Sequence, residues 1–135
     1  RKLLLEAVQT EPVVDALLKD GSDFVYIHLE GPDEMGHQGE LEHKVLSIEY
    51  IDERIIAAVK AGLDAAGEDY RILVLPDHPT PVRIRTHSNQ PVPYIIYSSK
   101  HTNNGVSNYN ETSCASGKYI ENGWDLMQYF IDSCN

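Results

Sequence analysis

The sequence predicts an α/β domain built on a mostly parallel β-sheet. Three observations carry this prediction. Residues 23–29 are rich in β-branched and aromatic side chains, and the run breaks at Gly31-Pro32. A second short apolar run, residues 71–75, ends at Pro76. Between the two runs lies a long segment with helical periodicity, and the order strand, helix, strand forms a crossover that makes the two strands parallel.

Length and charge narrow the class of protein. A chain of 135 residues is long enough for one hydrophobic core, so we expect a single domain over residues 1–135. The formal net charge of -10, without a basic stripe, argues against nucleic acid as a partner. No apolar run approaches the roughly 18–20 residues of a membrane span, so we expect no membrane partner either.

The N-terminal residues and the cysteines indicate the cellular compartment of the protein. The chain does not begin with Met, and its first apolar run is too short for a signal peptide because Glu6 follows at once. We therefore expect a processed product or a piece of a longer protein. Cys114 and Cys134 are expected to be reduced thiols in a cytoplasmic protein, with a disulfide between them as the alternative.

The first two elements are a helix and a strand. Apolar residues at spacings of three and four predict a helix over residues 2–19, which Pro12 divides so that a second, shorter helix ends at Gly21. Residues 23–29 then form a strand. Their apolar side chains at nearly every position predict burial on both faces, as in a parallel sheet.

The longest helix is expected from Gly39 or Glu40 to about Ala66, ended by Gly67. Its apolar residues fall on one stripe. They are Leu41, Val45, Ile48, Ile51, Ile55, Ile56, Val59 and Leu63. The next apolar run, residues 71–75, is the second strand.

The rest of the chain alternates loops with short elements. Residues 79–81, Pro-Thr-Pro, form a stiff loop, and residues 82–85 alternate like a short exposed strand. Residues 92–97 read as a further strand and residues 98–112 as a surface loop. A last helix is expected from about residue 122 to residue 132.

Five side chains suggest a metal site. Asp33 and His37 follow the first predicted strand, and Asp77 and His78 follow the second. The carboxyl ends of parallel strands share one edge of a sheet, so the two pairs should meet there, near His87. Mixed carboxylate and imidazole ligands suit divalent cations. The alternative is that the two aspartates cap turns and the histidines are solvated. The remaining histidines are assigned to packed or solvated positions: His28, His43 and His101.

Two arginines lie between the ligand candidates. Arg83 and Arg85 could bind a phosphorylated acid through bidentate contacts, and strand alternation would place both on one face. A solvated hairpin would show the same alternation. The sequence has no P-loop, no Gly-x-Ser-x-Gly elbow and no paired CxxC motif.

Four motifs carry a resemblance to a known family. They are Pro-Asp-Glu-Met-Gly-His-Gln-Gly at 32–39, Leu-Pro-Asp-His-Pro-Thr-Pro-Val-Arg at 75–83, Arg-Thr-His at 85–87 and Pro-Val-Pro at 91–93. From about Gly21 to the last helix, the chain resembles the cofactor-independent (2,3-bisphosphoglycerate-independent) phosphoglycerate mutases of the archaeal type. These belong to the alkaline phosphatase superfamily.

The resemblance implies a fold, a reaction and ligands. The chain would be the C-terminal part of a metal-binding catalytic domain, a partial three-layer sandwich. Asp33, His37 and His87 would hold one divalent ion, and Asp77 with His78 would contribute to a second. Mn²⁺ or Zn²⁺ would be typical, with Mg²⁺ possible. The reaction would interconvert 2- and 3-phosphoglycerate in glycolysis.

The resemblance also implies what the chain alone would lack. In this family the phosphorylated Ser or Thr nucleophile lies toward the N-terminus, so we expect it upstream of residue 1 and expect the isolated chain to be inactive. Uncovered sheet edges and apolar surface would favour self-association. Two alternatives stay open: a phosphatase or other phosphomutase of the same superfamily, and a non-catalytic metal-binding module.

Overall fold

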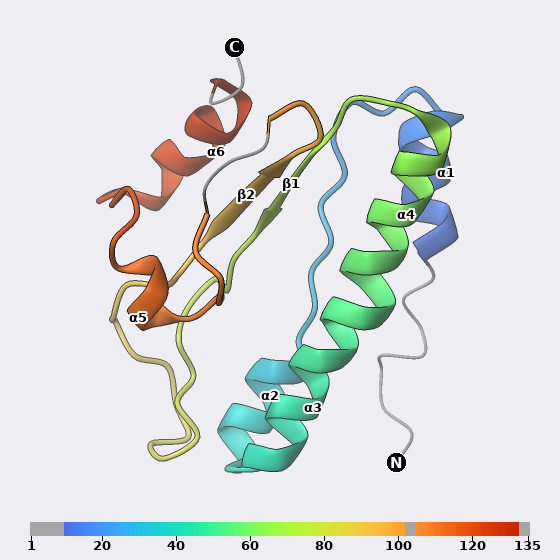
Figure 1. The fold of residues 1–135 in the computed structure, drawn as a ribbon. Coiled ribbons are helices and arrows are strands. Elements are labelled where there is room, and N and C mark those ends of the chain that lie inside the picture. Colours follow the sequence, from blue (N-terminus) through green and yellow to red (C-terminus); the bar gives the residue numbers. More distant parts are fainter. Residues whose placement is uncertain (1–9, 102–104, 133–135) are drawn as a thin grey trace. The chain divides into compact units, whose positions relative to one another are not determined.

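The computed structural model describes residues 10–101 and 105–132 (Figure 1). These residues divide into two compact units. The first runs to Glu68 and includes Thr80–Ser88, and the second comprises Asp69–Pro79 and the chain from Asn89 onward. The first unit holds four α-helices and the second holds two strands and two helices. The chain is therefore α/β, as predicted.

Helix α1, Thr10–Leu18, is the shorter helix predicted beyond the Pro12 interruption. Proline in a first turn costs no hydrogen bond, because the amides there have no partner within the helix. The predicted helix over residues 2–9 lies outside the described residues. Helix α1 packs on α4, Ala57–Ala66, where a Cβ at Gly62 would lie only 3.0 Å from Cγ2 of Val14.

Residues 23–29 differ from the prediction. They are extended but form no strand, and the side chains of Phe24 and Tyr26 are 52% and 70% exposed. Val25, Ile27 and Leu29 are half-buried, so burial alternates instead of covering both faces. A strand exists only with a neighbour that accepts its hydrogen bonds, and the described residues offer this segment none.

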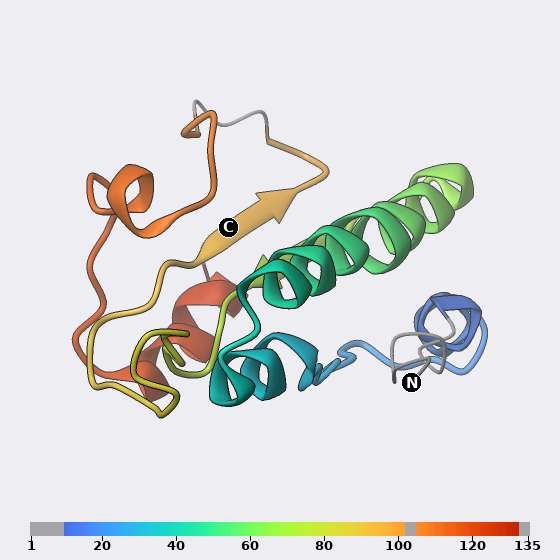
Figure 2. The same cartoon turned by 90° about the horizontal axis from the view of Figure 1, so that it is seen from below.

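Helix α2, Gly31–Gln38, follows directly and leads into the long helix. The long helix comprises α3 (Leu41–Ile51), a π-helical turn (η2, Asp52–Ile56) and α4, which together cover the predicted span (Figure 2). Gly67 ends it with φ of 70°, in the left-handed region that glycine adopts without strain. The predicted helix and its end are confirmed.

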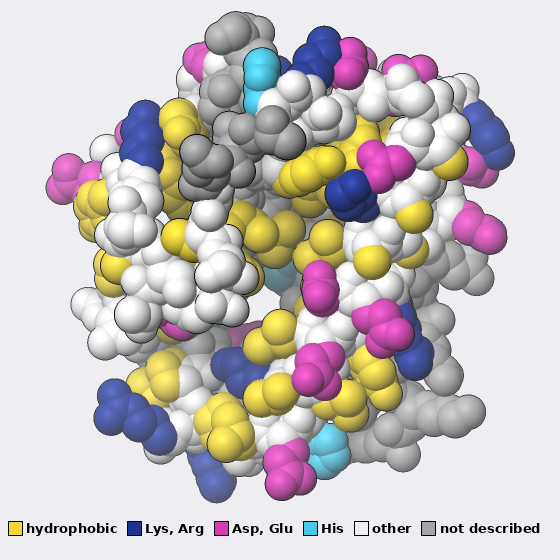
Figure 3. Space-filling model, viewed as in Figure 1, with side chains coloured by type: hydrophobic (Ala, Val, Ile, Leu, Met, Phe, Trp, Pro, Cys, Tyr) yellow, Lys and Arg dark blue, Asp and Glu magenta, His cyan; other side chains and the backbone are white. Residues whose placement is uncertain are grey.

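The first unit buries one half of the apolar stripe on the long helix. Ile55, Val59 and Leu63 are 3–7% exposed, and Met35 of α2 is equally buried. The α3 half of the stripe is mostly open, since three of its residues are 48–61% exposed and Ile51 is half-buried. The three are Leu41, Val45 and Ile48, and the neighbouring Leu46 is also 40% exposed. Figure 3 shows apolar and acidic side chains interspersed along this part of the surface. The unit therefore has a small core and a large apolar surface.

The second unit contains an antiparallel pair of strands. Strand β1, Arg71–Val74, pairs with β2, Ile95–Ser98, in the register Arg71↔Ser98. The predicted parallel sheet is thus not what the described residues form. Helix α6, Gly123–Asp132, confirms the predicted last helix. The Arg71 guanidinium donates to the carbonyls of Phe130 and Ile131 at 3.2 and 2.5 Å, and a cation at a helix C-terminus is stabilising.

Of the loop predicted over residues 98–112, residues 99–101 and 105–110 are irregular, whereas Ser98 ends β2 and positions 102–104 are not described. Helix α5, Glu111–Cys114, was not predicted, and Asn110 caps it by accepting a hydrogen bond from the Ser113 amide at 2.8 Å. Cys114 carries a free thiol, whereas Cys134 lies outside the described residues. Among the described helices, none is long and apolar enough to cross a membrane.

Candidate metal centre

Asp33 and His37 lie on α2, not in a loop as predicted. The helix starts at Gly31, Pro32 occupies its first turn, and acidic Asp33 is favourable there because the N-terminus carries partial positive charge. Residues four apart share one face of a helix. Accordingly, Nε2 of His37 lies 3.4 Å from Oδ2 of Asp33. The four-residue spacing of Asp33 and His37 thus brings the two side chains together across one turn of the helix.

His87 reaches this face from the segment Thr80–Ser88. The predicted strand over residues 82–85 is wrong, because these residues form a tight turn in which the amides of Ile84 and Arg85 both donate to the Pro81 carbonyl. Pro81 fixes φ for such a turn and has no N–H for a strand ladder. Because no strand forms, the inference that strand alternation places Arg83 and Arg85 on one face no longer holds. Both side chains are exposed.

Three side chains converge in this unit. Nε2 of His87 lies 3.0 Å from Nε2 of His37 and 3.3 Å from Oδ1 of Asp33. All three ligand atoms lie within 4.8 Å of one another. Zn²⁺ binds nitrogen and oxygen at about 2.0–2.1 Å, so two ligands of a tetrahedral site are about 3.3–3.4 Å apart. The 3.3 Å between Nε2 of His87 and Oδ1 of Asp33 matches such a site, whereas Nε2 of His37 approaches the other carboxylate oxygen, Oδ2, and the two Nε2 atoms are slightly closer together. The donor set of two imidazoles and a carboxylate fits a divalent ion.

The same site leaves room for a further ligand. The side chains of Asp33, His37 and His87 are 35%, 40% and 50% exposed. Three protein ligands with one side open to solvent are typical of catalytic metal sites, whereas structural sites are closed by four. The geometry is therefore that of a candidate catalytic centre.

The backbone of Arg85 orients one of the imidazoles. Nδ1 of His37 lies 3.0 Å from the Arg85 carbonyl oxygen. A carbonyl only accepts, so Nδ1 carries the proton, and the lone pair of the neutral ring is then on Nε2, the atom that lies near His87 and Asp33. Metal-binding histidines usually donate their second N–H to a carbonyl or carboxylate in this way. The sequence gives no signal for this contact, because it is made by the backbone of Arg85 and not by its side chain.

Asp77 and His78 belong to the second unit and contact each other. Oδ1 of Asp77 accepts a hydrogen bond from the His78 amide at 2.9 Å, and Oδ2 lies 3.4 Å from Nε2 of His78. The first contact is the local turn cap weighed as the alternative. Because β1 runs antiparallel to β2 and residues 23–29 form no strand, the argument from parallel strand ends no longer holds. A second metal site here stays a prediction.

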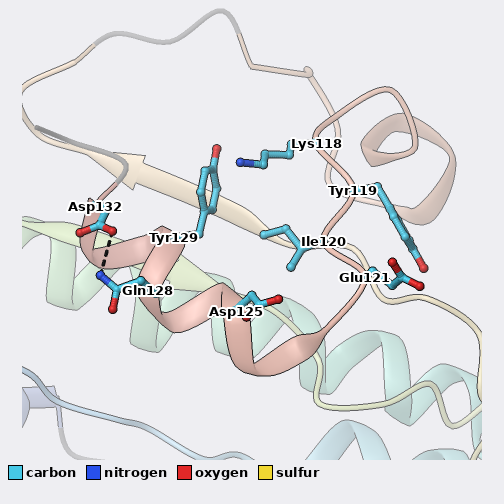
Figure 4. A pocket seen from close by; sticks show the side chains of 8 residues that line it. All are labelled: Lys118, Tyr119, Ile120, Glu121, Asp125, Gln128, Tyr129 and Asp132. Atoms are coloured by element: carbon cyan, nitrogen blue, oxygen red, sulfur yellow. Dashed lines mark hydrogen bonds between the residues drawn. The ribbon is translucent and has the colours of Figure 1, made fainter.

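The second unit also carries a groove of about 460 Å³ over α6 (Figure 4). Its lining combines three acidic and two aromatic residues with others: Lys118, Tyr119, Ile120, Glu121, Asp125, Gln128, Tyr129 and Asp132. The ammonium of Lys118 lies 4.0 Å from the centre of the Tyr129 ring, a cation–π contact that occupies part of the groove. None of the predicted site residues lines it, and it contains no histidine.

Comparison with known proteins agrees with the geometry. The family model described as the metalloenzyme superfamily matches residues 5–130. A probable 2,3-bisphosphoglycerate-independent phosphoglycerate mutase from Geobacter sulfurreducens is 45% identical over 115 residues, 84% of this chain and 29% of the relative. The mutase from Methanothrix thermoacetophila is 44% identical over 110 residues, 81% of this chain and 28% of the relative.

A more distant relative shows the same coverage. The phosphoglycerate mutase from Saccharolobus solfataricus is 36% identical over 121 residues, 88% of this chain and 28% of the relative. The chain thus spans less than a third of the length of these relatives. No solved structure matches significantly. The resemblance read from the motifs is confirmed: the chain belongs to the metalloenzyme superfamily.

Proposed function

We propose that this chain supplies a metal site of a phosphoglycerate mutase that interconverts 2- and 3-phosphoglycerate. The observation that carries the proposal is the convergence of Asp33, His37 and His87. The two Nε2 atoms lie 3.0 Å apart, and each lies 3.3–3.4 Å from one oxygen of the Asp33 carboxylate. The names of the relatives support the reaction. We further propose that this mutase serves glycolysis and acts in the cytoplasm.

The donor set indicates the class of metal. Imidazole ligands suit Zn²⁺ and the carboxylate suits Mn²⁺, whereas Mg²⁺ usually keeps several waters and is held by oxygen ligands, so Mn²⁺ or Zn²⁺ is proposed and Mg²⁺ is the less suited ion. Asp33, His37 and His87 would hold one ion, with Asp77 and His78 contributing to a second. Bound divalent ions neutralise the oxygens of a phosphoryl group in transfer. The chain's own part is to hold the carboxylate and both Nε2 atoms on one open face.

Arg83 and Arg85 are proposed to bind the phosphoglycerate. Both are exposed, and both lie in the turn that directly precedes His87. A guanidinium offers two parallel N–H donors to a phosphate or carboxylate, which a phosphorylated acid provides. The contact between the Arg85 backbone and His37 supports a turn whose backbone orients a metal ligand while its side chains bind the substrate.

The remaining residues of the reaction are proposed to lie in the longer protein. There the extended residues 23–29 would join a mostly parallel sheet of an alkaline-phosphatase-like three-layer sandwich, as part of a single catalytic domain that includes residues 1–135. The nucleophile would come from outside this chain, so the isolated chain would be inactive. The exposed stripe of α3 would favour self-association of the isolated chain.

A chimera tests the reaction. The region of the Geobacter sulfurreducens relative that matches this chain is replaced by the present sequence, and interconversion of the two phosphoglycerates is assayed with Mn²⁺. We expect conversion by the chimera and none by the isolated chain. His37→Ala should lower conversion by more than about 100-fold, because even loss of an outer partner of a metal ligand costs 10–100-fold.

His43→Ala is the matched control. His43 lies on α3, and its imidazole pairs with Glu40 at 3.3 Å, so conversion should be unchanged. A folded chimera that only releases phosphate would favour the phosphatase alternative. A folded chimera that binds Mn²⁺ without either reaction would favour a non-catalytic metal-binding module. Conversion by the isolated chain would contradict the claim that the nucleophile lies elsewhere.

A further inference from the structure

Thr80 contacts the carboxylate of the metal centre from a buried position. Its side chain is 4% exposed, and its Oγ1 donates to Oδ1 of Asp33 at 2.5 Å. Hydrogen bonds from a hydroxyl to a carboxylate are short and about twice as strong as neutral ones. Thr80 was noticed in the sequence only as part of the stiff Pro-Thr-Pro loop. Nothing in its residue type had marked it as part of the site.

Two further contacts fix the backbone of Thr80. Nζ of Lys44, on α3, donates to the Thr80 carbonyl at 2.6 Å. On α2, a Cβ at Gly36 would overlap that carbonyl and would lie 2.9 Å from Cγ2 of Thr80. Only glycine lets the helix approach so closely. The backbone of Thr80 is therefore held in place by its contacts with α2 and α3.

Together these contacts determine where the Asp33 carboxylate points. Asp33 and Gly36 lie on the same short helix, which packs on α3, so the contacts at Gly36 and Lys44 place the Thr80 hydroxyl relative to the helix that carries Asp33. A carboxylate that keeps one oxygen on a fixed donor loses the freedom to rotate about its side-chain bonds. The oxygen held by Thr80 is also the one 3.3 Å from Nε2 of His87.

We propose that Thr80 is a positioning residue, which holds the Asp33 carboxylate in the orientation that binds the metal. The proposal rests on the metal site proposed above and deepens it. Partners that orient a metal ligand typically contribute 10–100-fold to affinity. Thr80 acts through Asp33, and neither its hydroxyl nor its carbonyl is a ligand.

Metal titration of the chain gives the first test. Zn²⁺ is titrated into the wild type, Thr80→Val and Thr80→Ser, with folding checked by circular dichroism. Thr80→Val keeps the shape and removes the hydroxyl, so it should weaken Zn²⁺ binding by 10–100-fold. Thr80→Ser keeps the hydroxyl and should stay within about threefold of the wild type. Unchanged affinity in folded Thr80→Val would overturn the proposal.

A measurement on the metal-free chain tests the role of Thr80 independently of whether the chain binds a metal. Three-bond couplings of Asp33 Cγ to the backbone nitrogen and carbonyl carbon report its χ1 rotamer. We expect the values of a single rotamer in the wild type and Thr80→Ser, and averaged values in Thr80→Val. Thr80→Ala serves the same purpose should the valine variant not fold.

The two failures are then distinguishable. Wild-type couplings in both variants that lack the hydroxyl would overturn the role of Thr80, whatever the affinity for Zn²⁺. A wild type that does not bind Zn²⁺, but whose Asp33 rotamer depends on the Thr80 hydroxyl, would contradict the metal site and support the positioning role.

Discussion

The backbone carbonyl of Arg85 accepts a hydrogen bond from Nδ1 of His37 at 3.0 Å. Arg85 has φ of 55° and is the one non-glycine residue with positive φ in the described part of the chain. The left-handed conformation costs an L-residue about 1–2 kcal/mol. Such strain often marks a functional site. Here the strained residue supplies the carbonyl that selects the tautomer of His37.

The cost of this conformation is measurable with a pair of variants. Arg85→Gly and Arg85→Ala both remove the guanidinium, but only glycine adopts positive φ without strain. We expect Arg85→Gly to be more stable than Arg85→Ala by about 1 kcal/mol in chemical denaturation. Equal stabilities would show that Arg85 bears no backbone strain. Both variants keep the carbonyl, so both should keep the proton on Nδ1 of His37.

Gly36 should not tolerate a side chain. Gly36→Ala places a Cβ against the Thr80 carbonyl, and such overpacking typically costs about 1–3 kcal/mol. Gly123→Ala is the control, because a Cβ there meets nothing within 4 Å. The difference in free energy of unfolding between the two variants checks the packing of α2 on Thr80. A Gly36→Ala variant as stable as Gly123→Ala would contradict it.

The fold could be predicted where the determinants are local. Gly67 ends the long helix with positive φ, as its position after the apolar stripe predicted. The spacing of Asp33 and His37 indicated a shared site, although the structure achieves it on a helix. The strand predicted over residues 23–29 does not form, because a strand depends on partners elsewhere in the fold and the described residues provide none.

The candidate site shows the same division. Its ligand types and spacings are visible in the sequence, whereas the contacts that orient them are tertiary. Residues 82–85 form a turn although their alternating apolar and charged residues predicted a strand. Pro81 favours a turn and has no N–H to donate to a neighbouring strand. The burial of Thr80 and the approach of Lys44 depend on how α2 and α3 pack. No local pattern reports such contacts.

Lys44 should contribute more to stability than another lysine of the same helix. Lys44→Met removes the half-buried donor to the Thr80 carbonyl, and hydrogen bonds from charged groups are worth about 1.5–3 kcal/mol. Lys60→Met removes an exposed contact to Asp64, four residues on, and such pairs contribute about 0.3–0.5 kcal/mol. Thermal unfolding compares the two. Equal losses of stability in the two variants would contradict the stabilising contact between Lys44 and the Thr80 carbonyl.

Tyr109 should make stability depend on alkaline pH. Burial raises its pKa from 10.0 to about 12, and its hydroxyl donates to the Pro93 carbonyl at 2.9 Å. The folded state therefore favours the protonated phenol. The stability this contributes is fully present below pH 10 and is lost as the pH rises from about 10 to 12.

Tyr109→Phe lacks the titrating group and provides the reference. The free energy of unfolding of the wild type should fall relative to that of Tyr109→Phe over this pH range. Absorbance of the phenolate gives the pKa independently. A difference between the two proteins that stays constant from pH 9 to 12 would show that the folded state does not favour the protonated phenol.

The most direct test of the metal centre is a long-range ¹H–¹⁵N spectrum of the histidine rings, recorded while Zn²⁺ is added to the chain. The His37–Arg85 contact predicts that Nδ1 of His37 stays protonated. Nε2 of His37 and of His87 should shift together and saturate at one equivalent, while His43 on α3 stays unchanged. Saturation through other histidines, or through Nδ1 of His37, would contradict the account.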